Sequence, residues 1–120
     1  MPPKRRTDPA AGRAALDRWR AGGEVDRTTL ATAVRYTLEE LAARAPGHTL
    51  EVRVPPYGVT QCLPGPRHTR GTPPNVVETD AGTWLALVTG RVSWTNALAG
   101  GHLTASGERA DLDEWLPLLP

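Results

Sequence analysis

The chain has 120 residues, a formal net charge of +1 at pH 7 and 22% charged residues, which allows one domain with one sizeable core and excludes two. It contains neither an apolar run long enough to span a bilayer nor a signal-peptide core after its first residues. Because Cys62 is the single cysteine and cannot form an intramolecular disulfide, we predict a cytoplasmic protein.

Positive charge is concentrated near the N-terminus, where two acidic residues oppose six basic ones: Lys4, Arg5, Arg6, Arg13, Arg18 and Arg20 against Asp8 and Asp17. A basic segment of this kind can contact nucleic acid or an anionic membrane. A solvated terminus is the simpler interpretation. We therefore predict a basic disordered tail over residues 1–8 and expect no nucleic-acid partner.

Two helices are predicted next. The first begins at Asp8 and Pro9, ends at Gly22 and Gly23, and has a narrow apolar face that we expect to pack through Leu16 and Trp19 only. The second follows the capping residue Asp26 and ends before Pro46. Its apolar positions recur at three- and four-residue steps: Leu30, Ala33, Val34, Thr37, Leu38 and Leu41. This pattern predicts an amphipathic helix that packs on the protein's own sheet.

The period of the pattern then changes from that of a helix to that of a strand. Apolar and charged residues alternate over residues 50–54, Pro55 to Gly58 forms a turn, and residues 59–63 run back. We therefore predict a β-hairpin. Residues 64–75 have the composition of a loop, and residues 75–78 form a short third strand.

Glycines divide the C-terminal part of the chain. A helix capped by Asp80 contains Trp84 and ends at Gly90, and Ser93 begins a shorter one that ends at residues 100–101. In the next strand, HLTASG, alternate residues share a face. Asp111 is expected to cap a last helix, which Pro117 bends or breaks.

This order over Trp84 to Trp115 (helix, glycine, turn, helix, glycine, strand, glycine and closing helix) resembles the C-terminal half of the sterol carrier protein family. The resemblance implies a bacterial, stand-alone α+β domain over residues 9–120, with a mixed, mainly antiparallel sheet of four or five strands covered on one face by helices. It also implies non-enzymatic binding or transfer of a hydrophobic ligand, such as a fatty acid, lipid or sterol, in an apolar space between sheet and helices.

The expected wall of this apolar space comes from the second and third helices and the C-terminal part of the chain. The residues are Leu30, Val34, Leu38, Leu41, Leu85, Val88, Trp94, Leu98, Leu103 and Trp115. The same side chains would form a solid core if no tunnel exists, and the sequence leaves both possibilities open.

The loop over residues 64–75 is the candidate polar site. Arg67, His68 and Arg70 concentrate positive charge, and Gly65 and Gly71 let backbone amides approach a ligand. Such a loop can hold a phosphate or carboxylate, including a lipid head group, or it can contact a protein partner. An ordinary surface loop stiffened by prolines is the alternative.

Catalytic and metal sites have little support in the sequence. Cys62 and His68 are suitable types for a nucleophile and a base, but a small buried thiol is the more common use of a cysteine in a strand. His48, His68 and His102 are scattered and do not have the spacing of metal ligands. We expect no catalytic residues, no metal and no cofactor. A protein-interaction or regulatory domain with the same fold and no lipid ligand remains the alternative function.

Overall fold

The computed structural model describes residues 5–65 and 75–120. Over these residues the predicted order of helices and strands is confirmed except for the last helix. The elements are α1 (Pro9–Arg20), α2 (Arg27–Arg44), β1 (Leu50–Val54), β2 (Gly58–Cys62), β3 (Asn75–Thr79), α3 (Ala81–Thr89), α4 (Trp94–Ala99), β4 (Leu103–Ser106) and a short 3₁₀ helix (Asp113–Trp115).

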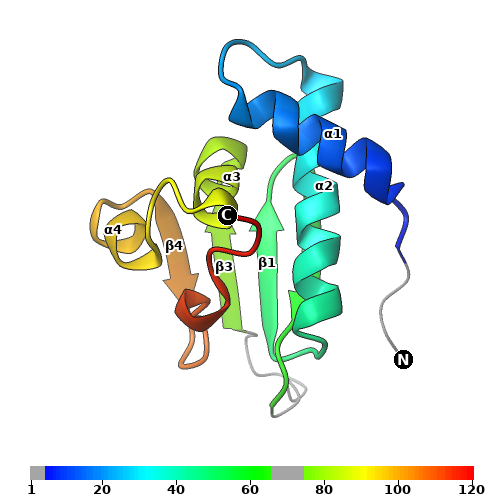
Figure 1. The fold of residues 1–120 in the computed structure, drawn as a ribbon. Helices are drawn as coiled ribbons and strands as arrows, with labels where there is room; N and C mark the ends of the chain where they lie inside the picture. The colour runs from blue at the N-terminus through cyan, green and yellow to red at the C-terminus, as the bar shows by residue number, and fades with distance from the viewer. Residues whose placement is uncertain (1–4, 66–74) are drawn as a thin grey trace.

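The sheet joins four strands in the order β2-β1-β3-β4 (Figure 1). The β1–β2 and β3–β4 pairs are antiparallel, whereas β1 and β3 are parallel. The hairpin pairs Val54 with Gly58, so three residues connect its strands. Within the described residues, the prediction of a mixed, mainly antiparallel sheet in an α+β fold is therefore confirmed.

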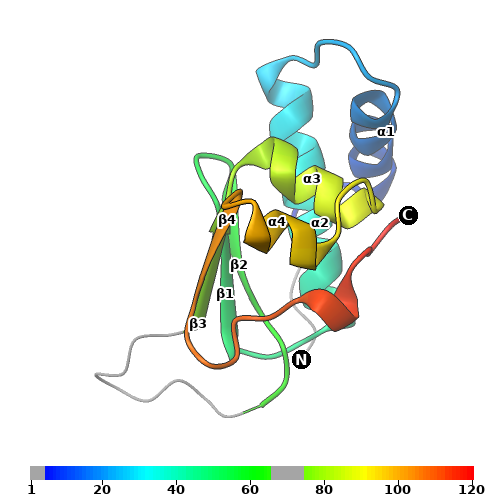
Figure 2. The same cartoon turned by 90° about the vertical axis from the view of Figure 1, so that its left-hand side faces the viewer.

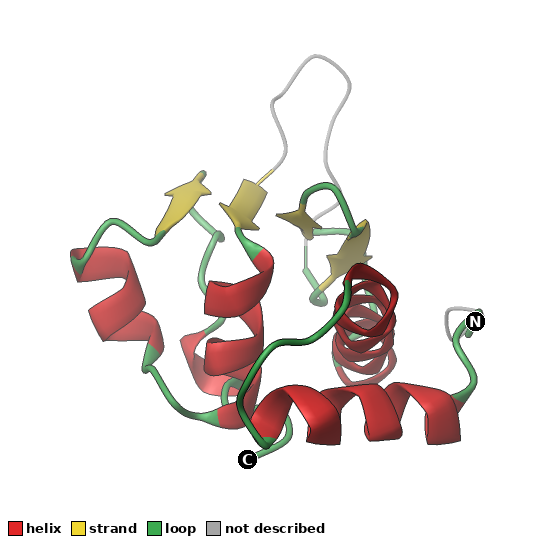
Figure 3. Ribbon diagram, turned by 90° about the horizontal axis from the view of Figure 1, so that it is seen from above, coloured by secondary structure: helices red, strands yellow, loops and turns green. Residues whose placement is uncertain are grey.

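The helices lie on one side of the sheet, as the views in Figures 2 and 3 show. On the helix side Val52, Val54 and Val77 are fully buried. Arg53 and Glu78, which alternate with them, are exposed on the other side. The period-two pattern therefore separates a covered apolar face from an open polar face. In the edge strand β4, Leu103 is buried but Ala105 is exposed.

The first described residues contact α2. The backbone N–H and hydroxyl of Thr7 donate to the Glu39 carboxylate at 3.0 and 3.1 Å, and Arg5 forms an ion pair with Glu40. Residues 5–7 of the predicted disordered tail therefore have defined hydrogen-bond partners. Residues 1–4 lie outside the described part of the chain.

The expectation that α1 packs through Leu16 and Trp19 only is wrong, because Gly12 and Ala15 are buried as well. A Cβ atom on Gly12 would lie 2.3 Å from Cγ of Tyr36 in α2. The missing side chain lets the two helices approach closely at this point. The apolar pattern of the sequence does not predict this contact, because such a pattern is recognised from large apolar side chains and glycine has none.

A buried hydrogen bond joins α2 to α3. The indole Nε1 of Trp84 donates to the Thr37 hydroxyl at 2.8 Å, and both residues are fully buried. The hydroxyl in turn donates to the Ala33 carbonyl at 2.8 Å. The sequence pattern predicted Thr37 as part of an apolar stripe. In the structure its hydroxyl oxygen accepts the hydrogen bond of Trp84, the largest fully buried side chain of the core.

Each predicted cap residue precedes its helix in α1 to α4, but not every one forms a side-chain hydrogen bond. The Ser93 hydroxyl accepts from Asn96 N at 3.1 Å, whereas the Asp80 side chain makes no capping hydrogen bond. The predicted last helix is wrong, because a single 3₁₀ turn stands in its place and Leu116 is extended. The proline that follows Leu116 disfavours helical geometry at that residue. The Asp111 carboxylate accepts the nearby N–H of Asp113, at 2.8 Å.

Candidate functional site

The structure brings together nine of the ten residues predicted to surround the apolar space. Seven lie in one buried cluster with the inner face of the sheet: Val34, Leu38, Leu41, Leu85, Val88, Trp94 and Leu103. Leu30 and Trp115 are partly buried against this cluster. Leu98 is on the outer side of α4 and is 44% exposed. These contacts show where the predicted residues lie. Ligand binding by them stays a prediction.

The polar-loop candidates Arg67, His68 and Arg70 lie outside the described residues. The anion site predicted for them therefore also stays a prediction. A different cluster of arginines lies on the opposite side of the helical layer from the sheet, where α1, α2 and the end of the chain meet.

Residues 116–119, which we term the C-terminal strap, lie between α2 and α3 (Figure 1). The backbone N–H groups of Leu118 and Leu119 both donate to the Val88 carbonyl of α3, at 3.0 and 2.9 Å. Arg44 of α2 donates to the Leu118 carbonyl, and Arg20 of α1 donates to the Leu119 carbonyl at 2.7 Å. The strap is therefore held by hydrogen bonds from two helices and by the bonds it donates to a third.

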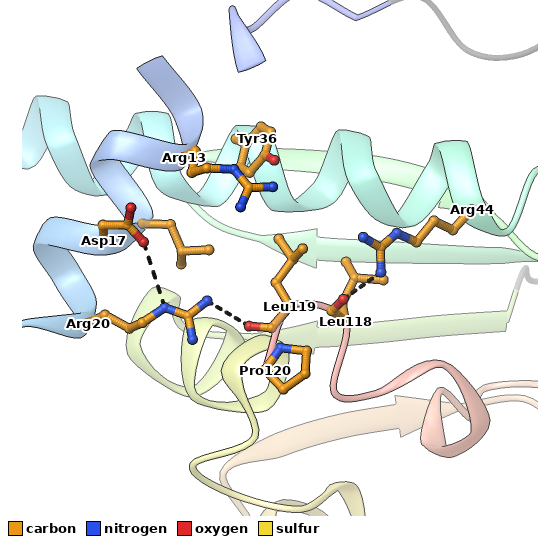
Figure 4. Close-up of a pocket in the computed structure, with 9 residues that line it drawn as sticks. Arg13, Asp17, Arg20, Tyr36, Arg44, Leu118, Leu119 and Pro120 are labelled. Carbon is orange, nitrogen blue, oxygen red and sulfur yellow. Dashed lines mark hydrogen bonds and ion pairs between the residues drawn. The ribbon is translucent and has the colours of Figure 1, made fainter. Parts of the chain in front are cut away.

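A groove of about 250 Å³ lies between α1, α2 and the strap (Figure 4). We term it the arginine groove. Its apolar floor includes Leu16, Leu118 and Leu119. Leu16 and Leu118 are only 2% and 3% exposed, so the floor is continuous with the core.

Three arginines, Arg13, Arg20 and Arg44, also line the groove, with Asp17 as the acidic lining residue. Arg20 Nε is 3.9 Å from the Asp17 carboxylate, and Arg44 pairs with Glu40 at 3.1 Å. The guanidinium of Arg13 lies beside Tyr36 and is directed into the groove (Figure 4). Within the described residues Arg13 has no ion-pair partner, so its charge is available to a ligand.

An apolar floor beneath converging guanidinium groups suits the anionic end of an amphipathic molecule. Arginine binds carboxylates and phosphates through two parallel hydrogen bonds. The groove is smaller than the roughly 300–1,000 Å³ of pockets that enclose a complete small ligand. It is therefore large enough for a single anionic group but too small to enclose a larger molecule.

Sequence reasoning missed this groove, although one signal was present. Arg13, Leu16, Asp17 and Arg20 have the spacing of one helix face. The basic residues of this region were instead interpreted as part of a solvated terminus. The partner Arg44 and the strap are distant in sequence, and only the fold brings them together.

The lone cysteine has properties that disfavour chemistry. Cys62 is fully buried in β2, and desolvation by this burial raises the pKa of its thiol to about 12. Because the thiolate is the reactive species, the thiol is a poor nucleophile at neutral pH. Within residues 5–65 and 75–120, no three His, Cys, Asp or Glu side chains are grouped to hold a metal ion.

The fold and its element order define a sterol-carrier-like α+β domain. A family model described as bacterial SCP ortholog, SCP standing for sterol carrier protein, matches residues 26–118, from the cap of α2 to the strap. The chain belongs to this family, so the resemblance seen in the sequence is confirmed. None of the curated proteins compared with the chain matches it. Among the described residues, no helix has the length and apolar character needed to cross a membrane.

Proposed function

We propose that this domain binds an anionic amphipathic lipid of the fatty-acid class without transforming it. The carboxylate lies in the arginine groove, and the acyl chain lies over the sheet between α2 and α3. The observation that carries the proposal is the convergence of Arg13, Arg20 and Arg44 on an apolar floor that joins the core. Family membership supports a hydrophobic ligand in this space.

The acyl chain takes the space that the strap leucines fill, so its methylenes replace Leu118 and Leu119 beside Leu16 as the apolar floor of the groove. Release of the strap also frees Arg20 and Arg44 from the Leu119 and Leu118 carbonyls. Four hydrogen bonds connect the strap to the helices, two to the Val88 carbonyl and one each from Arg20 and Arg44. Each contributes about 0.5–1.5 kcal/mol net. A bound acyl chain would replace the buried area of Leu118 and Leu119 at about 0.8 kcal/mol per CH₂. Methylenes beyond those that replace the leucine side chains therefore offset the lost hydrogen bonds of the strap.

The protonated, buried thiol of Cys62 supports binding without chemistry. The absence of a reaction stays part of the proposal, as does the cytoplasmic location predicted from the lone cysteine. An assay of purified protein with a fatty acid should return the acid unchanged. Recovery of a modified acid would contradict the non-enzymatic part of the proposal.

Displacement of a fluorescent fatty acid tests the head-group assignment. Arg13→Gln should weaken binding by about three- to tenfold, because it removes one charge-assisted hydrogen-bond partner at an exposed site. Arg18→Gln is the matched control, since it makes the same charge change on an exposed position of α1 outside the groove. Equal losses in both variants would refute a carboxylate bound in the groove.

Two further comparisons separate the two ends of the ligand. A fatty alcohol of the same chain length should bind more weakly than the acid to wild type, and this difference should shrink in Arg13→Gln. Leu38→Asp, which places a charge in the buried core cluster, should abolish uptake. Uptake that persists in a folded Leu38→Asp variant would exclude the space between sheet and helices.

The filled core favours a second candidate, a protein-interaction or regulatory domain without a lipid ligand. Val34, Leu41, Leu85 and Val88 are each 0% exposed, as in a solid core. On this alternative the 64–75 loop contacts a protein partner. A pull-down that depends on Arg67 and Arg70, together with no displacement of a fluorescent fatty acid, would support it. A loop variant that retains every partner would count against it.

A further inference from the structure

The turn that joins β1 to β2 exposes apolar surface away from the arginine groove. Pro55 and Pro56 are exposed, Tyr57 is partly buried, and Val59 is 59% exposed. Val59 is one of two large hydrophobic residues that stand out as exposed in the described structure. We term residues 55–59 the apolar tip.

Arginines surround the apolar tip. A groove of about 380 Å³ separates the tip from the first half of α2 and is lined by Arg27, Arg35 and Tyr57. Arg35 Nε donates to the Tyr57 carbonyl at 2.9 Å and so connects the tip to α2. A second hollow of about 470 Å³, on the other side of the tip, is lined by Arg53 and Val59.

The charge around the tip is positive. Arg27, Arg35 and Arg53 are exposed. Glu51, the acidic residue that lines the second hollow, is paired with Arg53 at 2.5 Å. Arg27 and Arg35 have no acidic partner among the described residues. They are eight positions, or about two helical turns, apart, and both line the groove on the side of α2 that faces the tip.

We propose that the apolar tip and its flanking arginines form a docking surface for an anionic lipid bilayer. Tyrosine favours the membrane interface, and a small apolar side chain such as that of Val59 enters the boundary of the acyl chains. Each arginine near an anionic surface contributes about 1 kcal/mol, or about fivefold in affinity. Stable attachment combines an apolar contact with a basic patch, and the tip supplies both.

This surface goes beyond the proposed ligand site and is tested separately from it. Flotation of the protein with vesicles of phosphatidylglycerol and phosphatidylcholine measures docking without any added fatty acid. The arginine groove is probed in solution without vesicles. Failure of one experiment therefore does not imply failure of the other.

The test compares one pair of substitutions at the tip with a charge-matched control pair elsewhere. Arg27→Gln with Arg35→Gln should reduce vesicle binding by about 25-fold, the product of two fivefold effects. Arg6→Gln with Arg109→Gln is the control, because it removes the same charge away from the tip. Arg6 contacts Glu39 in the second half of α2, and Arg109 N bonds Asn75 where β3 begins, at the opposite end of the sheet from the tip. The control should lose at most a few-fold.

The lysine variants distinguish a bilayer from a specific anion or protein ligand. Arg27→Lys with Arg35→Lys keeps both charges and should keep vesicle binding, whereas a site that needs paired guanidinium hydrogen bonds would lose its ligand. Val59→Ser should weaken vesicle binding while leaving the circular dichroism spectrum unchanged. Binding to pure phosphatidylcholine equal to that of the anionic vesicles, or equal losses in the glutamine and control pairs, would overturn the proposal.

Discussion

Thr37→Val tests whether the hydrogen bond between α2 and α3 stabilises the fold. The substitution keeps the branched shape and nearly the same helix propensity, but it removes the acceptor of the Trp84 Nε1–H, 2.8 Å away. Both residues are 0% exposed, so the indole N–H loses its hydrogen-bond partner away from water. An unsatisfied buried donor costs about 1–3 kcal/mol. The free energy of unfolding should fall by that amount.

Chemical denaturation followed by tryptophan fluorescence measures this change, and thermal melting should show a Tm lower by roughly 4 °C per kcal/mol. Thr37→Ser is the control, because it keeps the hydroxyl and loses one methyl. It should cost less than Thr37→Val. In a Trp84→Phe background the indole donor is gone, so Thr37→Val should then be nearly neutral. A Thr37→Val variant as stable as wild type would refute the reasoning.

Three further predictions concern stability. Gly12→Ala should destabilise the fold by about 1–3 kcal/mol against the Tyr36 ring, whereas the roughly 1 kcal/mol gain expected from helix propensity alone would refute the close helix contact. Ser93→Ala should cost about 1 kcal/mol in thermal unfolding, unlike Thr95→Ala on the same short helix. Because the folded-state pKa of Cys62 is raised from 9.0 to about 12, unfolding free energy should fall as pH rises above about 9, but less so in Cys62→Ala.

Local patterns predicted most of the fold. In α2, apolar residues recur every three or four positions, and in β1 apolar and charged residues alternate. Both patterns involve residues close together in the chain, so they can be recognised from the sequence alone. The same holds for Gly90, whose φ of 82° ends α3 in the left-handed geometry that glycine adopts readily. The error at the last helix was also local, since the effect of Pro117 on Leu116 was underestimated.

Long-range contacts could not be predicted in this way. The hydroxyl of Thr37 was assigned to an apolar stripe because its partner Trp84 is 47 residues away. The arginine groove takes Arg13 from α1, Arg44 from α2 and Leu118 from the strap, and no short motif contains them. The apolar residues of the predicted pocket were recognised individually, but the sequence does not distinguish a filled core from a tunnel.

Helix α1 lies outside the part of the chain that matches the family. The match begins at residue 26, whereas Arg13, Leu16 and Arg20 belong to the preceding helix. Arg44 and Leu118 lie within the matched range. One wall of the arginine groove therefore belongs to the common scaffold, and the other to a segment outside it. Substitutions in that helix can change the charge and width of the groove while the sheet stays the same. Under the proposed function, head-group preference could therefore diverge while the fold is retained.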